Sequence, residues 1–189
     1  MARPRTVSDD EILDAAAAAV AESGPAAVTL SQIGALAGLT AGALSQRFGS
    51  KRGLLLALAR RDAAALPARI ATAPGPAALI ETFARLAGGI TGPAEFANHL
   101  QFLLLDVTDP EFREVTRGYA TAIEEAIGTV LRSPDAGLPR AVHAAYNGAL
   151  ITWGMTGDGT PADAVRAALT RVLNRPEEIT GDAAAKDRG

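Results

Sequence analysis

The sequence of 189 residues contains no cysteine. A disulfide framework, a thiol nucleophile and a thiolate metal site are therefore excluded. No uninterrupted apolar run approaches the roughly 18 residues that a membrane span requires, so no membrane partner is expected. Acidic residues between Asp9 and Asp14 interrupt the basic amino terminus, which argues against a secretory signal. These absences favour a cytoplasmic protein with one large domain, or with a small module joined to a larger one.

Alternating runs rich in valine, isoleucine and threonine are also absent, whereas alanine is the most frequent residue. This composition predicts an all-α fold of about nine helices. The clearest interruption is the segment TAPGP, residues 72–76. We therefore predict an amino-terminal three-helix unit over residues 1–50, a connecting helix over 51–71, a carboxy-terminal helical domain over 77–175 and a disordered tail over 176–189.

The formal net charge of −3 conceals an uneven distribution. Residues 1–61 carry seven cations and five acids, whereas residues 62–189 carry eleven cations and sixteen acids. Between Ser23 and Arg61 there are five cations and no acid. An acid-free basic segment on an acidic chain suits a small contact with nucleic-acid phosphates. Chance unevenness is the alternative interpretation.

Two short amphipathic helices flank a Gly-Leu-Thr corner within this basic segment. Gly38 tolerates the positive φ that such a corner needs, and Leu39 can fill the angle between the helices. Thr40 can cap the second helix, which directs free backbone N–H groups toward phosphate. Ser50 can cap the following long helix. This arrangement predicts a helix-turn-helix, which places its second helix in the major groove of DNA.

The second helix of this motif carries side chains suited to reading DNA. Small residues at Ala41 and Ala43 permit a close approach to the groove, and Gln46 can bond an adenine edge. Arg47 and Lys51 can neutralise phosphates. The predicted DNA-contacting residues are Thr29, Ser31, Thr40, Ala41, Ala43, Ser45, Gln46, Arg47 and Lys51.

The segments EILDAAAAAVAESG, VTLSQIGALAGLT and AGALSQRFGSKRGLL resemble the DNA-binding domain of the tetracycline-repressor (TetR) family. The resemblance covers about a third of the chain. It implies an all-helical homodimer whose first three helices bind DNA and whose carboxy-terminal helices bind a small effector and dimerise. Four positions depart from the family pattern. Ser45 replaces a common Tyr, Arg47 replaces a His or Tyr, and Val20 replaces a common Phe. Gly34 replaces a better helix former at a cost of roughly 1 kcal/mol.

The resemblance also implies an effector pocket among the middle helices, where most aromatic residues occur. An effector pocket needs apolar walls and a few polar groups. The predicted lining residues are Phe83, Phe96, His99, Phe102, Leu103, Tyr119, Tyr146, Asn147 and Trp153. The alternative is that the aromatic residues only fill the core. Residues 94–107 are apolar on nearly all sides, which predicts a helix buried on most sides. No cofactor is expected, and no metal site is predicted because His99 and His143, the only two histidines, do not share a helix.

The helix predicted from residue 139 to 154 has two apolar faces. One face holds Leu138, Val142, Ala145, Ala149 and Trp153, and the other holds Ala141, Ala144, Gly148 and Ile151. With the last helix, it is predicted to form half of a four-helix dimer interface. The predicted interface residues are Val142, Ala145, Ala149, Trp153, Val165, Leu169 and Val172. Burial within one subunit is the alternative.

These features predict a ligand-responsive transcriptional regulator, a repressor that binds a palindromic double-stranded DNA operator as a homodimer and responds to an unknown small-molecule effector. Two other classes remain open. An enzyme is disfavoured because the chain has no glycine-rich phosphate loop and no His and acid at a catalytic spacing. A helical protein-binding module that has lost DNA binding is conceivable because Ser45 lacks the aromatic ring. A regulator activated by another protein is a further alternative.

Overall fold

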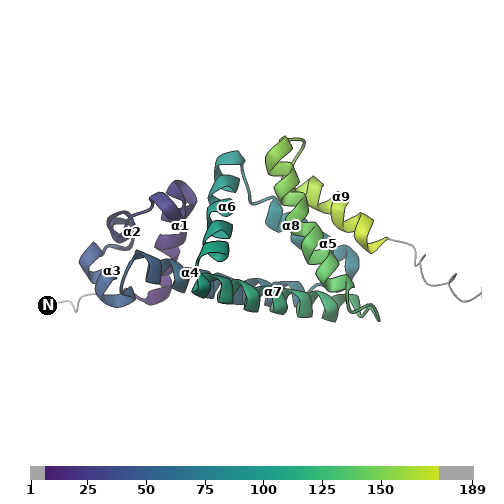
Figure 1. Cartoon of the computed structure of the whole chain (residues 1–189), viewed down its shortest axis with the longest axis horizontal. Helices are drawn as coiled ribbons and strands as arrows, with labels where there is room; N and C mark the ends of the chain where they lie inside the picture. The colour runs from purple at the N-terminus through teal and green to yellow at the C-terminus, as the bar shows by residue number, and fades with distance from the viewer. Residues whose placement is uncertain (1–6, 175–189) are drawn as a thin grey trace, which may run out of the picture.

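The computed structural model describes residues 7–174, in which there are nine helices and no strands. Figure 1 shows their arrangement. The helices are α1 (Asp9–Ala27), α2 (Leu30–Ala37), α3 (Ala41–Phe48), α4 (Lys51–Ala71), α5 (Pro76–Ala87), α6 (Pro93–Thr108), α7 (Pro110–Leu131), α8 (Leu138–Thr156) and α9 (Pro161–Leu173). The predicted all-α fold is confirmed. The predicted tail at 176–189 lies outside the described residues. No helix in the described range has the length and apolar character needed to cross a membrane.

The first four helices begin where side chains cap their free N–H groups. Ser8 and Glu11 form a capping box at α1, and Thr29 and Gln32 form another at α2. Thr40 caps α3 through the backbone N–H of Ala43, and the hydroxyl of Ser50 caps α4. Gly38 ends α2 in the left-handed conformation, with φ of 68°. The predicted helix-turn-helix corner is therefore present.

Gly34 has a structural role that its sequence position does not reveal. A Cβ atom at this position would lie 2.6 Å from the carbonyl oxygen of Leu39. The N–H of Leu39 donates to the carbonyl of Gly34 at 2.8 Å, so the corner folds tightly against α2. Gly34 therefore lowers helix propensity, but a larger residue at this position would prevent the close approach of the Leu39 backbone.

The amino-terminal unit, residues 9–58, is termed the head. Its core contains apolar side chains from α1, α2, α3 and the first turns of α4, including Ile12, Ile33, Leu44 and Leu54, all fully buried. Phe112 of α7 is buried in the same core, so α7 reaches the head. This contact fixes one end of the remaining helices against the DNA-binding module.

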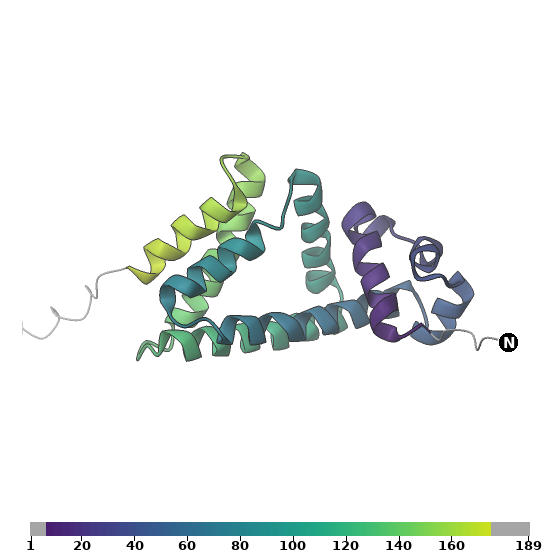
Figure 2. The same ribbon diagram turned by 180° about the vertical axis from the view of Figure 1, so that it is seen from behind.

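Helices α5 to α9, residues 76–173, are termed the body and share a second core with the end of α4. Fully buried members include Ile70, Leu79, Ile123 and Leu169. Helix α4 runs alongside α7 and spans from the head to this core, as Figures 1 and 2 show from opposite sides. Helix α4 is therefore the main covalent and packing link between head and body.

Helix α6 is far less buried than the sequence predicts. Only Phe96 is buried on it. The side chains of Leu100, Leu103, Leu104 and Val107 are 41–61% exposed. The prediction of burial on most sides is wrong because α6 packs mainly on α1 and α7 and lacks a neighbour on its third side within the described chain. The apolar character of α6 thus exceeds what the single chain covers.

Candidate nucleic-acid interface and effector site

Helix α3 presents one face to solvent and buries the other. Leu44 is fully buried in the head core, and Phe48 packs against that core. Ser45 and Gln46, on the opposite side, are exposed. The side chain of Gln46 is therefore exposed to solvent, as base contact requires, and the neighbouring Ser45 offers only a hydroxyl there.

The amino-terminal end of α3 also faces solvent. Thr40 is exposed, and its hydroxyl accepts from the N–H of Ala43 at 3.1 Å. The first N–H groups of a helix have no acceptor within the helix, so this end offers donors to an anion. Thr29 occupies its capping box at α2, and Ser31 is exposed in the first turn of that helix. Ala41 and Ala43 are half-buried.

Arg47 and Lys51 turn back toward α1. The Arg47 guanidinium donates to the carbonyl of Val7 at 2.6 Å and pairs with Asp9. The Lys51 ammonium donates to the carbonyls of Pro25 at 3.3 Å and Ala26 at 2.8 Å. Both cations therefore have protein partners, and an outward phosphate contact would require each to exchange them.

The cations between residues 23 and 61 are less available for phosphate contacts than the sequence predicts. Arg47, Arg52 and Arg61 each form an ion pair with a carboxylate outside that segment. Asp9 and Asp14 come from α1, whereas Asp109 comes from the start of α7. The unbroken run of positive charge is thus partly neutralised by folding.

Arg52 joins the head to the body. Its guanidinium donates to both oxygens of Asp109 at 2.7 Å and to Glu111 at 3.2 Å. The hydrogen bonds from Arg52 hold the pKa of Asp109 below its ordinary value, at about 2. Asp109 also caps α7 by accepting from the N–H of Glu111 at 2.9 Å. One carboxylate thus fixes both the start of α7 and the position of α4.

Several predicted effector-site residues form the body core instead. Phe83 lies 4.8 Å from the ring of Tyr146, and Phe96 lies 5.8 Å from that of Trp153. The indole N–H of Trp153 donates to the carbonyl of Gly159 at 3.3 Å. Burial raises the pKa values of Tyr119 and Tyr146 to about 12. Phe83 thus pairs with Tyr146 and Phe96 with Trp153, while Tyr119 packs on the same core and its ring contacts that of His143.

The other predicted effector-site residues do not join this cluster. Phe102 packs on the head core, whereas His99, Leu103 and Asn147 are exposed. The predicted set therefore spans two cores and the surface. Within the described residues, no three His, Cys, Asp or Glu side chains are arranged to hold a metal ion.

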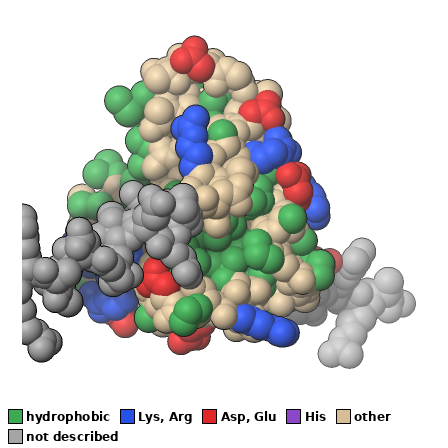
Figure 3. Space-filling view, turned by 90° about the vertical axis from the view of Figure 1, so that its right-hand side faces the viewer, with side chains coloured by type: hydrophobic (Ala, Val, Ile, Leu, Met, Phe, Trp, Pro, Cys, Tyr) green, Lys and Arg blue, Asp and Glu red, His purple; other side chains and the backbone are tan. Residues whose placement is uncertain are grey.

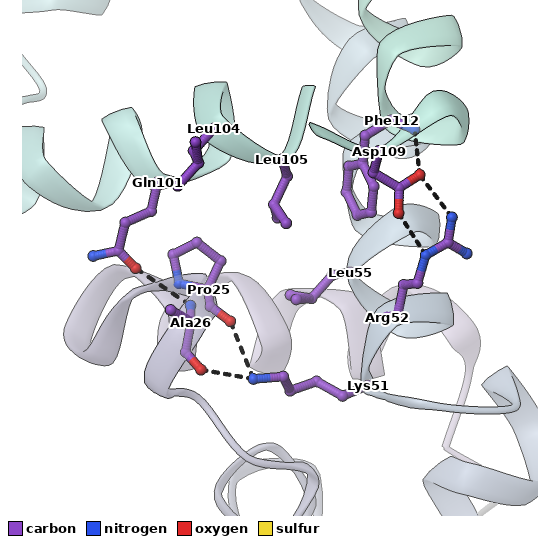
Figure 4. Close-up of a pocket in the computed structure, with 10 residues that line it drawn as sticks. All are labelled: Pro25, Ala26, Lys51, Arg52, Leu55, Gln101, Leu104, Leu105, Asp109 and Phe112. Carbon is purple, nitrogen blue, oxygen red and sulfur yellow. Dashed lines mark hydrogen bonds and ion pairs between the residues drawn. The ribbon is translucent and has the colours of Figure 1, made fainter. Parts of the chain in front are cut away.

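A pocket of about 340 Å³ lies at the junction of head and body, as Figure 4 shows. Its lining residues are Pro25, Ala26, Lys51, Arg52, Leu55, Gln101, Leu104, Leu105, Asp109 and Phe112. None of the predicted effector-site residues belongs to it. Sequence reasoning missed it because its walls come from four helices separated by up to 87 positions. A second hollow of about 330 Å³ lies between the α4–α5 turn and the end of α7.

The predicted dimer residues occupy the inner face of the last two helices. Val142, Val165 and Leu169 are fully buried, and Trp153 is 8% exposed. Ala145, Ala149 and Val172 pack on the same core. These side chains pack within their own chain, so the predicted dimer residues lie on the face of α8 and α9 that is turned toward the body core. The second face of α8 is exposed and consists of Ala141, Ala144, Gly148, Ile151 and Met155.

Hydrophobic side chains are also grouped at the end of the body. Figure 3 shows them in the centre of that view with charged side chains around them. The body therefore has apolar surface beyond α6.

Two family models match the chain. Residues 12–58 match the model described as bacterial regulatory proteins, tetR family, and residues 74–175 match the tetracyclin repressor-like C-terminal domain. The chain belongs to the TetR family. It is therefore a DNA-binding transcriptional regulator whose helix-turn-helix is formed by α2 and α3.

Individual proteins are also similar to the chain. The chain is 32% identical over 137 residues to the HTH-type transcriptional repressor AcnR of Corynebacterium efficiens, covering 70% of this chain and 69% of the relative. A transcriptional regulator from Rhodococcus sp. RHA1 superposes with a TM-score of 0.71 at 19% identity, over 88% of this chain and 96% of that one. The multidrug binding protein EbrR complexed with proflavin superposes with a TM-score of 0.62 at 22% identity, over 87% and 98%. The two structures support the fold.

Proposed function

We propose that the protein is a repressor that binds a palindromic operator as a homodimer and releases it when a small effector binds the region between head and body. The observation that carries the DNA-binding part is the exposed face of α3, with Gln46 in solvent and Leu44 anchored in the head core. The similarity to the repressor AcnR supports the direction of regulation. The protein acts by binding, without catalysis, in the cytoplasm.

The DNA-contacting surface comprises the amino-terminal end and exposed face of α3 with the start of α2. Thr40, Ala41 and Ala43 line the end that approaches phosphate, while Ser45 and Gln46 face base edges. Thr29 and Ser31 lie at the start of α2, where that helix would cross the backbone. Arg47 and Lys51 reach phosphate only by leaving their partners on α1.

The dimer interface uses the exposed face of α8. Ala141, Ala144, Gly148, Ile151 and Met155 recur at intervals of three and four residues, the spacing of a helix–helix seam. A Cβ atom at Gly148 would contact nothing within 4 Å, so the surface there is open. Two heads related by a two-fold axis read half-sites about 34 Å apart, one turn of DNA.

Substitution of Gln46 by Ala tests the reading face. We expect the variant to bind operator DNA with reduced discrimination at one base pair of each half-site, a loss of about 1–3 kcal/mol. Asn174→Ala is the matched control because it removes an exposed amide at the end of α9, away from the head and from the exposed face of α8. Competition binding to single-base operator variants measures the effect. Unchanged discrimination in Gln46→Ala would place base recognition elsewhere.

A further inference from the structure

The pocket at the head–body junction has apolar walls from four helices. Leu55 of α4 and Leu105 of α6 point into it from opposite sides in Figure 4, and Phe112 of α7 closes one end. Pro25, at the bend of α1, forms the facing wall. Its volume of about 340 Å³ lies at the lower end of the range for small-molecule sites, which suits a one-ring molecule.

The charged groups at the pocket differ in whether a group of opposite charge pairs with them. Both oxygens of Asp109 accept from Arg52, so this pair is internally neutralised. Lys51 contacts only the carbonyls of Pro25 and Ala26, and no carboxylate pairs with it among residues 7–174. An ammonium group has three N–H donors, so one donor and the full positive charge remain available. The pocket therefore has one uncompensated positive charge beside apolar walls.

We infer that this pocket binds a small apolar monocarboxylate, whose carboxylate pairs with Lys51 and whose ring lies between Leu55, Leu105 and Phe112. This inference rests on the proposed function, since it identifies the effector class. An ion pair between the ammonium and a carboxylate adds the attraction of two opposite charges, which the present bonds to neutral carbonyls lack. A neutral alcohol of the same shape gains the apolar contacts and at most a hydrogen bond without that attraction.

The site lies where an occupant touches both parts of the molecule. The amide of Gln101 on α6 accepts from the N–H of Ala26 at 3.3 Å, and Asn98 donates to the carbonyl of Ala21 at 3.0 Å. Helix α6 thus holds the bent end of α1, and the Arg52–Asp109 pair holds α4 to α7. A ligand wedged among these elements favours one head position over another, which is the requirement for coupling to DNA affinity.

Calorimetric titration with 4-tert-butylbenzoate tests the inference, with 4-tert-butylbenzyl alcohol as the neutral isostere. We expect saturable binding of one acid per chain and binding of the alcohol weaker by about tenfold or more. In Lys51→Met the affinity for the acid should fall to that for the alcohol, whereas Arg60→Met, on the same helix but outside the pocket, should bind like the parent protein. Absence of saturable acid binding at millimolar concentration would overturn the inference, as would a Lys51→Met variant with unchanged affinity.

A pocket-filling variant locates the site independently of charge. Leu105→Trp should abolish binding of both probes, while Leu103→Trp should not, because Leu103 lies on the same helix and does not line the pocket. Circular dichroism establishes that each variant is folded. If Leu105→Trp does not fold, protection of Lys51 from amine acetylation by bound acid supplies the location. Equal binding by both tryptophan variants, or unprotected Lys51, would overturn the inference.

Operator binding separates failure of this inference from failure of the proposed function. If the protein binds DNA selectively but binds no acid, and the acid does not change DNA binding, the proposed function stands and the effector site is wrong. If the protein binds the acid through Lys51 but selects no DNA sequence, the effector site stands and the proposed function is wrong.

Discussion

Gly24 holds a backbone conformation that other residues rarely adopt, with φ of 76° and ψ of 158°, where α1 bends. A Cβ atom there would lie 2.5 Å from the amide oxygen of Asn98. Gly24→Ala should therefore lower the free energy of unfolding by about 2 kcal/mol or more. Gly118→Ala, where nothing lies within 4 Å, should raise it by about 0.5–1 kcal/mol. Urea denaturation measures both, and an equally stable Gly24→Ala variant would show that the bend is not constrained.

Asp109 gives stability that depends on pH. Its pKa in the folded protein is depressed to about 2, so its contribution is present above its unfolded pKa and is lost as pH falls through the folded pKa. Asp109→Asn should keep the helix cap while removing the charge that pairs with Arg52. We expect a lower Tm than the parent protein at pH 7, with the difference narrowing as pH approaches 2. A difference in Tm at pH 2 as large as that at pH 7 would contradict this role for the carboxylate.

Local features of single residues were predictable, and distant pairings were not. The caps at Thr40 and Ser50 and the left-handed Gly38 follow from short-range rules and are confirmed. The Arg52–Asp109 pair joins residues 57 positions apart, and a single sequence carries no rule that specifies such a pairing. For this reason, the sequence overestimates how many cations of residues 23–61 are free to contact phosphate.

Helix α6 is the element with the least complete packing. Its side chains Leu100, Leu103, Leu104 and Val107 face solvent, and only Phe96 is buried. Segments with few buried apolar contacts open at low free energy. The backbone amides of α6 should therefore exchange hydrogen for deuterium faster than those of α4 and α7. Mass spectrometry of peptides from the three helices measures this, and equal protection of α6 would show that another surface covers it.

Helix existence was predictable, but burial of each face was not. The apolar composition of residues 94–107 indicates a helix, and α6 is one. Its burial depends on neighbours, and periodicity within one segment contains no information about them. The same limit applies to α8, whose two apolar faces were identified although the inner one was assigned to the partner.

At the scale of the whole molecule, the exposed face of α8 defines the proposed assembly. Gly148→Glu should convert the dimer to the 19.3 kDa monomer, because a carboxylate would be buried in a seam of small and apolar residues. Gly118→Glu is the matched control, since a Cβ atom at either glycine meets nothing within 4 Å. Light scattering after size-exclusion chromatography gives both masses. If Gly148→Glu remains a dimer, the interface must lie on another face of the protein.

The break near residues 72–76 was visible in the sequence, and it lies between the end of α4 at Ala71 and the start of α5 at Pro76. The junction pocket arises where α1, α4, α6 and α7 meet, so it depends on how head and body pack together. Its residues share no motif or spacing that marks them as one site.

Selection of bound sequences from a random duplex pool, at near-physiological salt, tests the central claim most directly. We expect enrichment of an inverted repeat with half-site centres about one helical turn apart. A folded, dimeric protein that enriches no sequence would contradict the account.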